Sequence, residues 1–563
     1  MKQRYVIGLD FGTKSGRALL VDAKTGETAA QSVKDYAHGV MDRFLPDGKT
    51  ALGAGWALQH PKDYLDTLEY TVREAVSLAG IPAGDIIGLS IDFTACTILP
   101  IDAARRPLCF LEKYKNRPHA YVKLWKHHAA LPQTSRINEV LAEEGLIDLP
   151  LYGGKVSSEL FLPKVMQILE EDPEIYHSAD AVLEAADWLT LLLTGENRRS
   201  FSMASYKAMW DGEKYPSARL LRAFNPGLEH VVEEKMAAEI VPLGSKIGEL
   251  NEEWAGRLGL LPGTAVGASI IDAHAGLPGC GITKPGQMML IIGTSSVQAV
   301  LSEKPYSGKG VMGGVNGGII DGYYALESGL AGVGDIFEWF VSNAVPERYG
   351  AMAKAEGKSL FRFLGEAAAK GRPGKSGLLA LDWWNGNKTP FVDAGLSGVL
   401  VGCTMATRPE DIYRALVEAT GFGTRMIMDT FAEAGVEIDE IRACGGIAEK
   451  DPALMQIYAD ITNREIKVSA SGQTAALGAA MYAATAAGAE RGGYSRIAGA
   501  AAAMSRTRDR AFTPNPDNVA PYSALYSHYR ELSAYFGANG IMKELKALSG
   551  GQGSADLLTS RIN

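Results

Sequence analysis

The sequence has few cysteines, and they are widely spaced. Its 563 residues include no Cys-x-x-Cys pair, and its five cysteines are Cys96, Cys109, Cys280, Cys403 and Cys444. Zinc sites and disulfide scaffolds need cysteines at short, regular spacings, so we expect neither here. Isolated free cysteines are typical of a reducing compartment, which favours a cytoplasmic protein.

Long apolar runs and an excess of positive charge are also missing. The first apolar run, from Tyr5 to Leu9, stops at Asp10, and it is shorter than the roughly 7–15 residues of a signal peptide. No stretch approaches the roughly 18 apolar residues that span a bilayer. The net charge of −9 offers no basic surface to nucleic acid or to an anionic membrane. We therefore expect neither a membrane nor a nucleic acid as a partner.

Two familiar nucleotide-binding motifs are absent as well. A phosphate-binding loop of the form Gly-x-x-x-x-Gly-Lys-Ser/Thr needs a first glycine where this chain has Ala369 or Arg43. There is no His-Glu-x-x-His zinc motif, and no Gly-x-Gly-x-x-Gly follows a predicted strand. Any phosphate site must therefore be built in another way.

The sequence does contain an alternation of strand and helix patterns. Residues 5–22 predict a β-hairpin, residues 61–80 a helix that ends at Gly80, and residues 85–94 a buried strand. Such alternation is typical of an α/β protein with a mostly parallel or mixed sheet. The chain is too long for one hydrophobic core, so we expect two large domains, at 1–283 and 284–548, and a flexible tail at 549–563.

A weak internal repeat supports the expectation of two domains. Aligning Gly12-Thr13 with Gly293-Thr294 places Leu20 on Leu301, and both copies consist of a strand, a Gly-Thr turn and a second strand. A duplicated domain would produce this pattern, with the two turns facing each other across a cleft.

Each of these turns could bind a polyanion through backbone N–H groups and hydroxyls, because glycine lets the main chain approach closely. Either turn alone is more often a plain hairpin turn, but the pair favours a phosphate site. The candidate residues are Gly12, Thr13, Lys14, Ser15 and Arg17 in the first turn, and Gly293, Thr294 and Ser295 in the second.

Two aspartates, Asp10 and Asp272, stand just past strongly apolar strands, where side chains enter a crevice. A carboxylate there could hold Mg²⁺ or accept a proton from a substrate hydroxyl. For Asp272, a role as a helix N-cap explains the local sequence equally well. His274 suggests a metal pair with Asp272, but an incidental histidine is the more common case.

A third glycine segment, Gly445-Gly446, follows a predicted strand, and a helix is expected to start at Pro452. Paired glycines leave a flat backbone surface on which an adenine could lie. A plain strand-to-helix turn explains them equally well.

Together these segments resemble the FGGY family of carbohydrate kinases, a branch of the actin-like ATPase superfamily. LDFGTKSGRALLVD is similar to the first phosphate motif of the family, LIIGTSS to the second, ASIIDAHAG to the strand with the catalytic aspartate, and CGGIAEKDPALMQIYADIT to the adenosine motif. The resemblance covers residues 4–540. It implies an α/β fold of two actin-like, ribonuclease-H-like ATPase domains that face each other across a catalytic cleft, with ATP and Mg²⁺ as cofactors.

Within the family, the segments GLSIDFTACTILPID, KYKNRPHAYVKLWKHHA, SFSMASYKAMWD and ALDWWNGNKTP resemble the branch that phosphorylates L-ribulose. By that analogy the sugar is contacted by Ala95, Lys207, Asp272 and Glu327, with Asp92 as an addition from the same loop. The nucleotide is contacted by Gly334, Glu338, Gly445, Gly446 and Lys450. Glu338 and Lys450 depart from the Gln and Asn of glycerol kinases, which weakens the analogy at those two positions.

The resemblance implies ATP-dependent phosphorylation of L-ribulose to L-ribulose 5-phosphate, a step of L-arabinose catabolism. Asp272 would be the general base, Asp10 would position Mg²⁺, and the phosphates would be held by Thr13, Ser15, Arg17 and Thr294. Kinases for D-ribulose, ribitol or xylulose would use the same machinery, and a non-kinase actin-like ATPase is a further alternative. The expected partner is a small sugar, and a homodimer is one assembly that the sequence leaves open.

Overall fold

The computed structural model describes residues 2–144, 152, 154–306 and 308–549. Its first sheet is built around strand β1, which pairs in parallel with β5 and antiparallel with β2. The strand order across the sheet is β11 (Lys246–Glu249), β12 (Ala265–Gly267), β5 (Ile86–Phe93), β1 (Tyr5–Phe11), β2 (Ser15–Asp22) and β3 (Thr28–Asp35), and β13 (Ile270–Ile271) also pairs with β5. The hairpin predicted for residues 5–22 is confirmed.

The second sheet repeats this arrangement. Its central strand β14 pairs antiparallel with β15 and in parallel with β19. The order is β16 (Tyr324–Leu330), β15 (Ser296–Ser302), β14 (Gly286–Ile292), β19 (Ile438–Cys444), β20 (Glu465–Ser469) and β21 (Thr507–Phe512). Both sheets end in an antiparallel strand, at β11 and at β21. The predicted α/β architecture is therefore confirmed, and the internal repeat corresponds to two sheets of the same topology.

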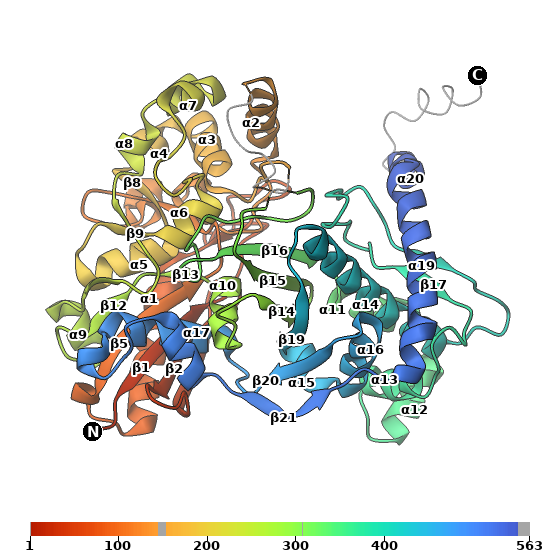
Figure 1. Ribbon diagram of the computed structural model, residues 1–563. Coiled ribbons are helices and arrows are strands. Elements are labelled where there is room, and N and C mark those ends of the chain that lie inside the picture. Colours follow the sequence, from red (N-terminus) through yellow and green to blue (C-terminus); the bar gives the residue numbers. More distant parts are fainter. Residues whose placement is uncertain (1, 145–151, 153, 307, 550–563) are drawn as a thin grey trace.

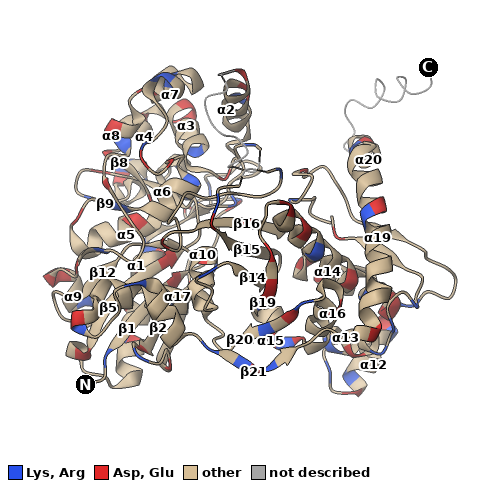
Figure 2. Ribbon diagram, viewed as in Figure 1, with Lys and Arg blue, Asp and Glu red and all other residues tan. Residues whose placement is uncertain are grey.

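Helices cover both sheets, and several begin and end where the sequence predicts. On the first sheet lies α1 (Pro61–Ala79), which Gly80 ends in the left-handed conformation (φ 62°). The second half of the chain contains α11 (Gly334–Asn343), α12 (Glu347–Ala355), α13 (Leu360–Ala369), α14 (Pro409–Glu433), α15 (Gly446–Lys450), α16 (Pro452–Thr462), α19 (Pro516–Ala538) and α20 (Ile541–Ser549). Both signs of charge are interspersed over the two halves in the view of Figure 2.

A smaller layer with its own apolar core stands above the first sheet and contains most of the segments expected to bind the sugar. Its strands are β4 (Leu58–Gln59), β7 (Val122–Lys123), β6 (Ile98–Ile101) and β8 (Ala181–Glu184). Its helices are α2 (Leu131–Glu144), α3 (Phe161–Glu171), α4 (Pro173–Ser178), α7 (Ala218–Phe224) and α8 (Val231–Lys235). This half also contains the shorter elements β9 (Arg198–Ser200), β10 (Glu239–Val241), α5 (Ala185–Thr194), α6 (Phe201–Lys207) and α9 (Glu252–Leu258). In the other half, β17 (Leu379–Leu381) pairs with β18 (Val399–Val401).

Helices α17 (Thr474–Ala487) and α18 (Ile497–Met504) lie in sequence between strands β20 and β21 of the second sheet, but both pack on the first sheet. Figure 1 shows this blue segment within the red and orange half. The helix lies so close to the sheet that a Cβ atom on Gly8 of β1 would stand 1.8 Å from the carbonyl oxygen of Ala476. The expected division at 283/284 stays a proposal, since the first core includes residues from beyond it. The expected tail lies almost entirely outside the described residues.

Helix α17 also crosses α10 (Asp272–Gly279) at close range within the first core. Small residues make this crossing possible. A Cβ atom on Gly478 would lie 1.8 Å from the carbonyl oxygen of Ala275, and one on Gly279 would lie 2.1 Å from that of Thr474. Because both obstacles are backbone atoms of helices, neither can move without shifting a helix.

We expect Gly478→Ala to lower the free energy of unfolding by roughly 1–3 kcal/mol, the usual cost of overpacking a tight contact. The measurement is the urea midpoint of the purified variant. Gly350→Ala is the matched control, because Gly350 lies in helix α12 with open space around its Cβ position. Alanine there should raise stability slightly, by roughly 0.5–1 kcal/mol. Equal midpoints for Gly478→Ala and the unmodified protein would contradict the close crossing.

Among the described residues, no helix is both long enough and apolar enough to cross a membrane.

Candidate active site

Three carboxylates lie at neighbouring strand ends of the first sheet. Asp10 at the end of β1 stands beside Asp92 at the end of β5, because the two strands are parallel and in register there. Strand β13 pairs with the same end of β5, and Asp272 follows it directly as the first residue of α10. Side chains at the carboxyl ends of parallel strands enter a common crevice. The structure thus brings together the three aspartates that the sequence singled out.

The charges of these carboxylates are poorly compensated. Burial raises the pKa of Asp92 well above its usual value, as do the charges of Asp10 and Asp272, and neither Asp92 oxygen has a hydrogen-bond partner among the described residues. Burial also raises the pKa of Asp10, although Arg17, 3.5 Å away, opposes that shift. For Asp272, burial and the charge of Asp10 raise the pKa to about 7.

A further cation beside these carboxylates would favour their ionised forms. Hard carboxylate oxygens are the donors that Mg²⁺ prefers. The unpartnered oxygens of Asp92, with the Asp10 carboxylate beside them, therefore fit a magnesium ion at this edge of the sheet.

The first Gly-Thr turn is held in place from three directions. Gly12 N–H donates to the carbonyl oxygen of Ser15 (3.0 Å), which closes the turn. The indole N–H of Trp125 donates to the Thr13 hydroxyl (3.0 Å), and the side-chain amide of Gln59 donates to the Thr13 carbonyl (2.7 Å). Lys14 is exposed at the tip of the turn. The Thr13 hydroxyl is thus oriented before any ligand arrives.

Arg17 has partners of its own. Besides Asp10, its guanidinium donates to the Ser15 hydroxyl (3.1 Å) and to the Gln473 side chain (3.2 Å), which belongs to the other half. The guanidinium therefore links Asp10, the first turn and the segment that leads into α17. The expected contact of Arg17 with a phosphate stays a prediction.

The second turn meets the other glycine segments of the predicted nucleotide site. Gly293 N–H donates to the Ser295 carbonyl (2.9 Å), and Gly334 N–H at the start of α11 donates to the Gly293 carbonyl (3.0 Å). Adding a Cβ atom to Gly334 would place it 2.7 Å from that same carbonyl oxygen. Gly445, at φ 95°, approaches Ile292 so closely that a Cβ atom would stand 2.5 Å from the Ile292 carbonyl oxygen.

Three segments far apart in sequence therefore meet around the second turn, and Thr294 and Gly446 remain exposed there. Two other predicted nucleotide contacts, Glu338 and Lys450, are exposed on helices α11 and α15. Glu338 accepts a hydrogen bond from Ser342 (2.9 Å). Their contact with the nucleotide stays a prediction.

On the sugar side, Lys207 at the end of α6 and Glu327 on β16 belong to different halves of the chain. Burial alone would lower the pKa of Lys207, but nearby negative charges, that of Glu327 among them, raise it above its usual value. Burial favours the neutral form of Glu327 as well, but the hydrogen bond from His274 and the charge of Lys207 lower its pKa to about 2. Both side chains are therefore charged, and both influence Asp272 electrostatically.

A buried lysine holds the backbone of the loop that contains Ala95. Cys96 adopts φ 53°, which is uncommon for a residue with a side chain. The ammonium of Lys164, fully buried, donates to the Cys96 carbonyl (2.5 Å) and to the Leu124 carbonyl (2.7 Å). Lys164 thereby fixes the backbone next to Ala95, the expected sugar contact.

The sequence did not single out Trp125, Gln59 or Lys164, and it treated His274 as incidental. Trp125 lies within a segment typical of one branch of the family and Lys164 lies outside all of them, and their partners Thr13 and Cys96 are 112 and 68 residues away. No local pattern signals such contacts.

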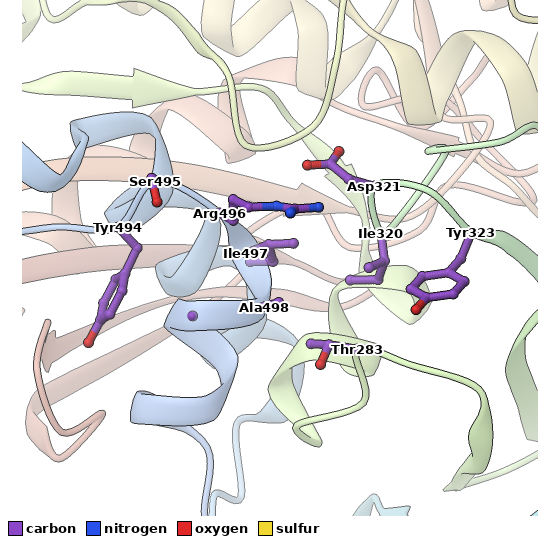
Figure 3. A pocket seen from close by; sticks show the side chains of 10 residues that line it. Thr283, Ile320, Asp321, Tyr323, Tyr494, Ser495, Arg496, Ile497 and Ala498 are labelled. Carbon is purple, nitrogen blue, oxygen red and sulfur yellow. The ribbon is translucent and has the colours of Figure 1, made fainter.

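A cavity of about 360 Å³ lies elsewhere, between α18 and the segment before β16. Figure 3 shows Arg496 and Asp321 extending toward each other from its two sides. Its lining consists of Thr283, Ile320, Asp321, Tyr323, Tyr494, Ser495, Arg496, Ile497, Ala498 and Gly499. None of these is a predicted site residue, so the catalytic assignment rests on the strand ends and the glycine turns.

Comparison with known proteins agrees with this geometry. The N-terminal domain model of the FGGY family of carbohydrate kinases matches residues 5–279, and the C-terminal domain model matches residues 288–487. A ribulokinase from Anoxybacillus flavithermus is 50% identical over 549 residues, which are 97% of each chain. A ribulokinase from Mycolicibacterium smegmatis is 45% identical over 547 residues, covering 97% of this chain and 96% of that protein.

Among solved structures, a xylulose kinase from Brucella ovis superposes with a TM-score of 0.77 at 20% identity, covering 95% of this chain and 100% of the other. At that identity the likeness speaks for the fold alone. It confirms the expected architecture of two domains with similar α/β folds.

Proposed function

The chain belongs to the FGGY family of carbohydrate kinases, and we propose that it transfers the γ-phosphoryl group of ATP to the 5-hydroxyl of L-ribulose. The product is L-ribulose 5-phosphate, as in L-arabinose catabolism. Support comes from the full-length similarity to proteins named ribulokinase. The observation that carries the proposal is that Glu327 of the second half contacts His274 on α10, the helix that Asp272 begins (2.9 Å), with the charge of Lys207 near enough to influence Asp272. The alternative of a non-kinase ATPase is set aside, because the family consists of carbohydrate kinases.

In this mechanism Asp272 is the general base. Its Oδ1 atom accepts a hydrogen bond from the Ala273 N–H (2.7 Å), which leaves the other oxygen to take the proton of the sugar hydroxyl. The hydroxyl oxygen then attacks the γ-phosphorus in line, a reaction that depends mainly on positioning and charge stabilisation. Lys207 and Glu327 hold the sugar through charged hydrogen bonds, and Ala95 contacts it through its backbone.

The phosphates are held by the two turns. The N–H groups and hydroxyls of Thr13, Ser15 and Thr294 face the γ- and β-phosphates, while Gly334, Gly445 and Gly446 leave backbone surface for the nucleoside. Asp10, with Asp92 beside it, would hold Mg²⁺, which when bound neutralises the phosphate oxygens.

The pKa of Asp272 near 7 predicts the pH dependence. A general base works only when it is deprotonated, so kcat/KM for the sugar should fall about tenfold for each pH unit below the pKa of Asp272 and level off above it. Mg²⁺ at Asp10 would remove part of the repulsion that raises this pKa, so the bend in the profile should lie at or below pH 7. The measurement is initial-rate kinetics from pH 5.5 to 8.5, with protein stability checked at each pH. A flat profile over that range would contradict the assignment of Asp272 as a base with a raised pKa.

The substrate is tested by measuring ADP release with Mg-ATP and a panel of L-ribulose, D-ribulose, xylulose, ribitol and glycerol. The proposal requires the highest kcat/KM with L-ribulose. A clear preference for another member of the panel would overturn the substrate assignment while leaving the family and the base in place.

A further inference from the structure

A buried histidine joins the two sides of the proposed sugar site. His274, on α10, has Nε2 2.9 Å from the Glu327 Oε2 atom on β16 and Nδ1 3.4 Å from the Ser202 hydroxyl on α6. The ring of Tyr206 packs against it at a centroid distance of 4.4 Å. His274 is 1% exposed, so both ring nitrogens are committed to protein partners.

The surroundings determine which atoms donate. Burial lowers the pKa of His274, and the charge of Lys207 adds to that shift, while Glu327 opposes it. The imidazole is therefore neutral and carries one N–H. Because the Glu327 carboxylate is ionised and can only accept, Nε2–H donates to it and Nδ1 accepts from the Ser202 hydroxyl. This pairing fixes both the tautomer and the orientation of the ring.

The contact leaves Glu327 with one oxygen for a ligand. Oε2 is engaged by His274, and within the described part of the chain no hydrogen bond reaches Oε1. Glu327 is 22% exposed, so that oxygen can meet a sugar hydroxyl. A carboxylate that is held at one oxygen loses less freedom when the other binds a ligand.

The position of His274 in the fold gives the contact a second effect. Helix α10 is short and begins with Asp272, the proposed base. Glu327 belongs to the second sheet, so its bond to His274 ties that sheet to the helix that carries the base. We infer that His274 is a positioning residue, which orients Glu327 toward the sugar and keeps it in a fixed position relative to Asp272. This inference rests on the proposed function and specifies how that same site recognises its sugar.

A metal-binding role does not fit the same residues. Both ring nitrogens of His274 are already engaged, one with Glu327 and the other with the Ser202 hydroxyl. Lys207 also faces this pair and repels a second cation. The neutral hydrogen-bonded histidine accounts for all of the contacts.

His274→Phe tests the inference, because it keeps a ring against Tyr206 and removes the N–H donor. A hydrogen bond to a charged group is worth enough for the sugar KM to rise about tenfold or more. The KM for ATP should change less than twofold, and kcat should fall less than the sugar KM rises. His274→Gln, whose amide can still donate to Glu327, should restore most of the sugar affinity. His528→Phe is the matched control, since it removes an exposed histidine–glutamate contact of 3.4 Å.

A double-mutant cycle with Glu327→Gln separates positioning from general packing. If His274 acts through Glu327, then His274→Phe should raise the sugar KM much less in the Glu327→Gln background than in the unmodified protein. An equal rise in both backgrounds, or no rescue by His274→Gln, would overturn the inference.

The cycle is run with whichever acceptor in the panel gives the highest kcat/KM, after thermal melting shows that each variant is folded. A preference for a different sugar would thus refute the proposed substrate without affecting this test.

Discussion

Replacing Asp272 by asparagine is expected to lower kcat by roughly 10²–10⁴-fold, the span that a positioned general base contributes. Asparagine keeps the size of the side chain, and its carbonyl oxygen can still accept from Ala273 N–H. It cannot take a proton at the pH of the assay. Because the substitution removes a negative charge from a cluster of like charges, the variant should fold at least as well as the parent protein.

The KM values for ATP and for the sugar should change much less than kcat in this variant. Asp321→Asn is the matched control, since it makes the same chemical change in the exposed cavity of Figure 3, and its kcat should stay within about twofold of the parent value. Turnover of Asp272→Asn within tenfold of the parent would remove Asp272 from the role of base.

The second large effect is expected for Lys207→Ala, which should raise the sugar KM by roughly 10–100-fold, the range for loss of a charged hydrogen bond. The ammonium is buried, and its charge helps to keep Glu327 ionised. Removing the ammonium takes away one proposed sugar contact. It also makes protonation of Glu327, the other proposed charged contact, easier. The KM for ATP should stay nearly constant, because no predicted phosphate contact depends on Lys207.

Lys62→Ala controls for the loss of a lysine, since Lys62 lies on the exposed face of α1 in a surface pair with Asp66. Surface pairs of this kind contribute little to stability, so its kinetics should match those of the parent. A sugar KM for Lys207→Ala within twofold of the parent would refute the assignment, provided that thermal melting shows the variant to be folded.

The parts of the site that could be predicted from sequence depend on local chemistry. A strand, a Gly-Thr turn and a returning strand are contiguous in the chain, so both phosphate turns are visible at Gly12 and Gly293. To predict that Asp10 and Asp92 lie side by side, one must also know that β1 pairs in parallel with β5. The α/β alternation suggests such a pairing but does not define its register.

The contacts that could not be predicted join distant segments. His274 and Glu327 are 53 residues apart, and Trp125 and Thr13 are 112 apart. Such partners are chosen by tertiary packing, and a single sequence contains no periodicity that reveals them.

Two local predictions were wrong for identifiable reasons. The sequence SSELFLPKVMQILEE predicts a helix capped by Ser157 or Ser158, but the helix begins at Phe161, because the Ser157 hydroxyl accepts from the Glu159 N–H in a separate turn. The composition of residues 505–521, SRTRDRAFTPNPDNVAP, predicts an irregular linker, but this segment contains strand β21, whose TRDRAF sequence has little apolar alternation. It pairs with β20 at the edge of the sheet, so its charged side chains can stay in solvent. These charged residues interrupt the apolar pattern by which a strand is usually predicted.

The position of α17 has a consequence for how the protein is made. The last core strands of the first sheet, β12 and β13, end at Ile271, and β5 ends at Phe93, but the helix that covers them starts at Thr474. At the usual pace of roughly 5–20 residues per second, a ribosome reaches the end of α17 some 20–80 s after it has finished β5. During that time one face of the nascent sheet, including Gly8 and Gly88 where α17 will pack, has no cover. Folding of the half that is synthesised first therefore waits for the half that is synthesised last, and a fragment ending near residue 283 should emerge from the ribosome as a client for chaperones.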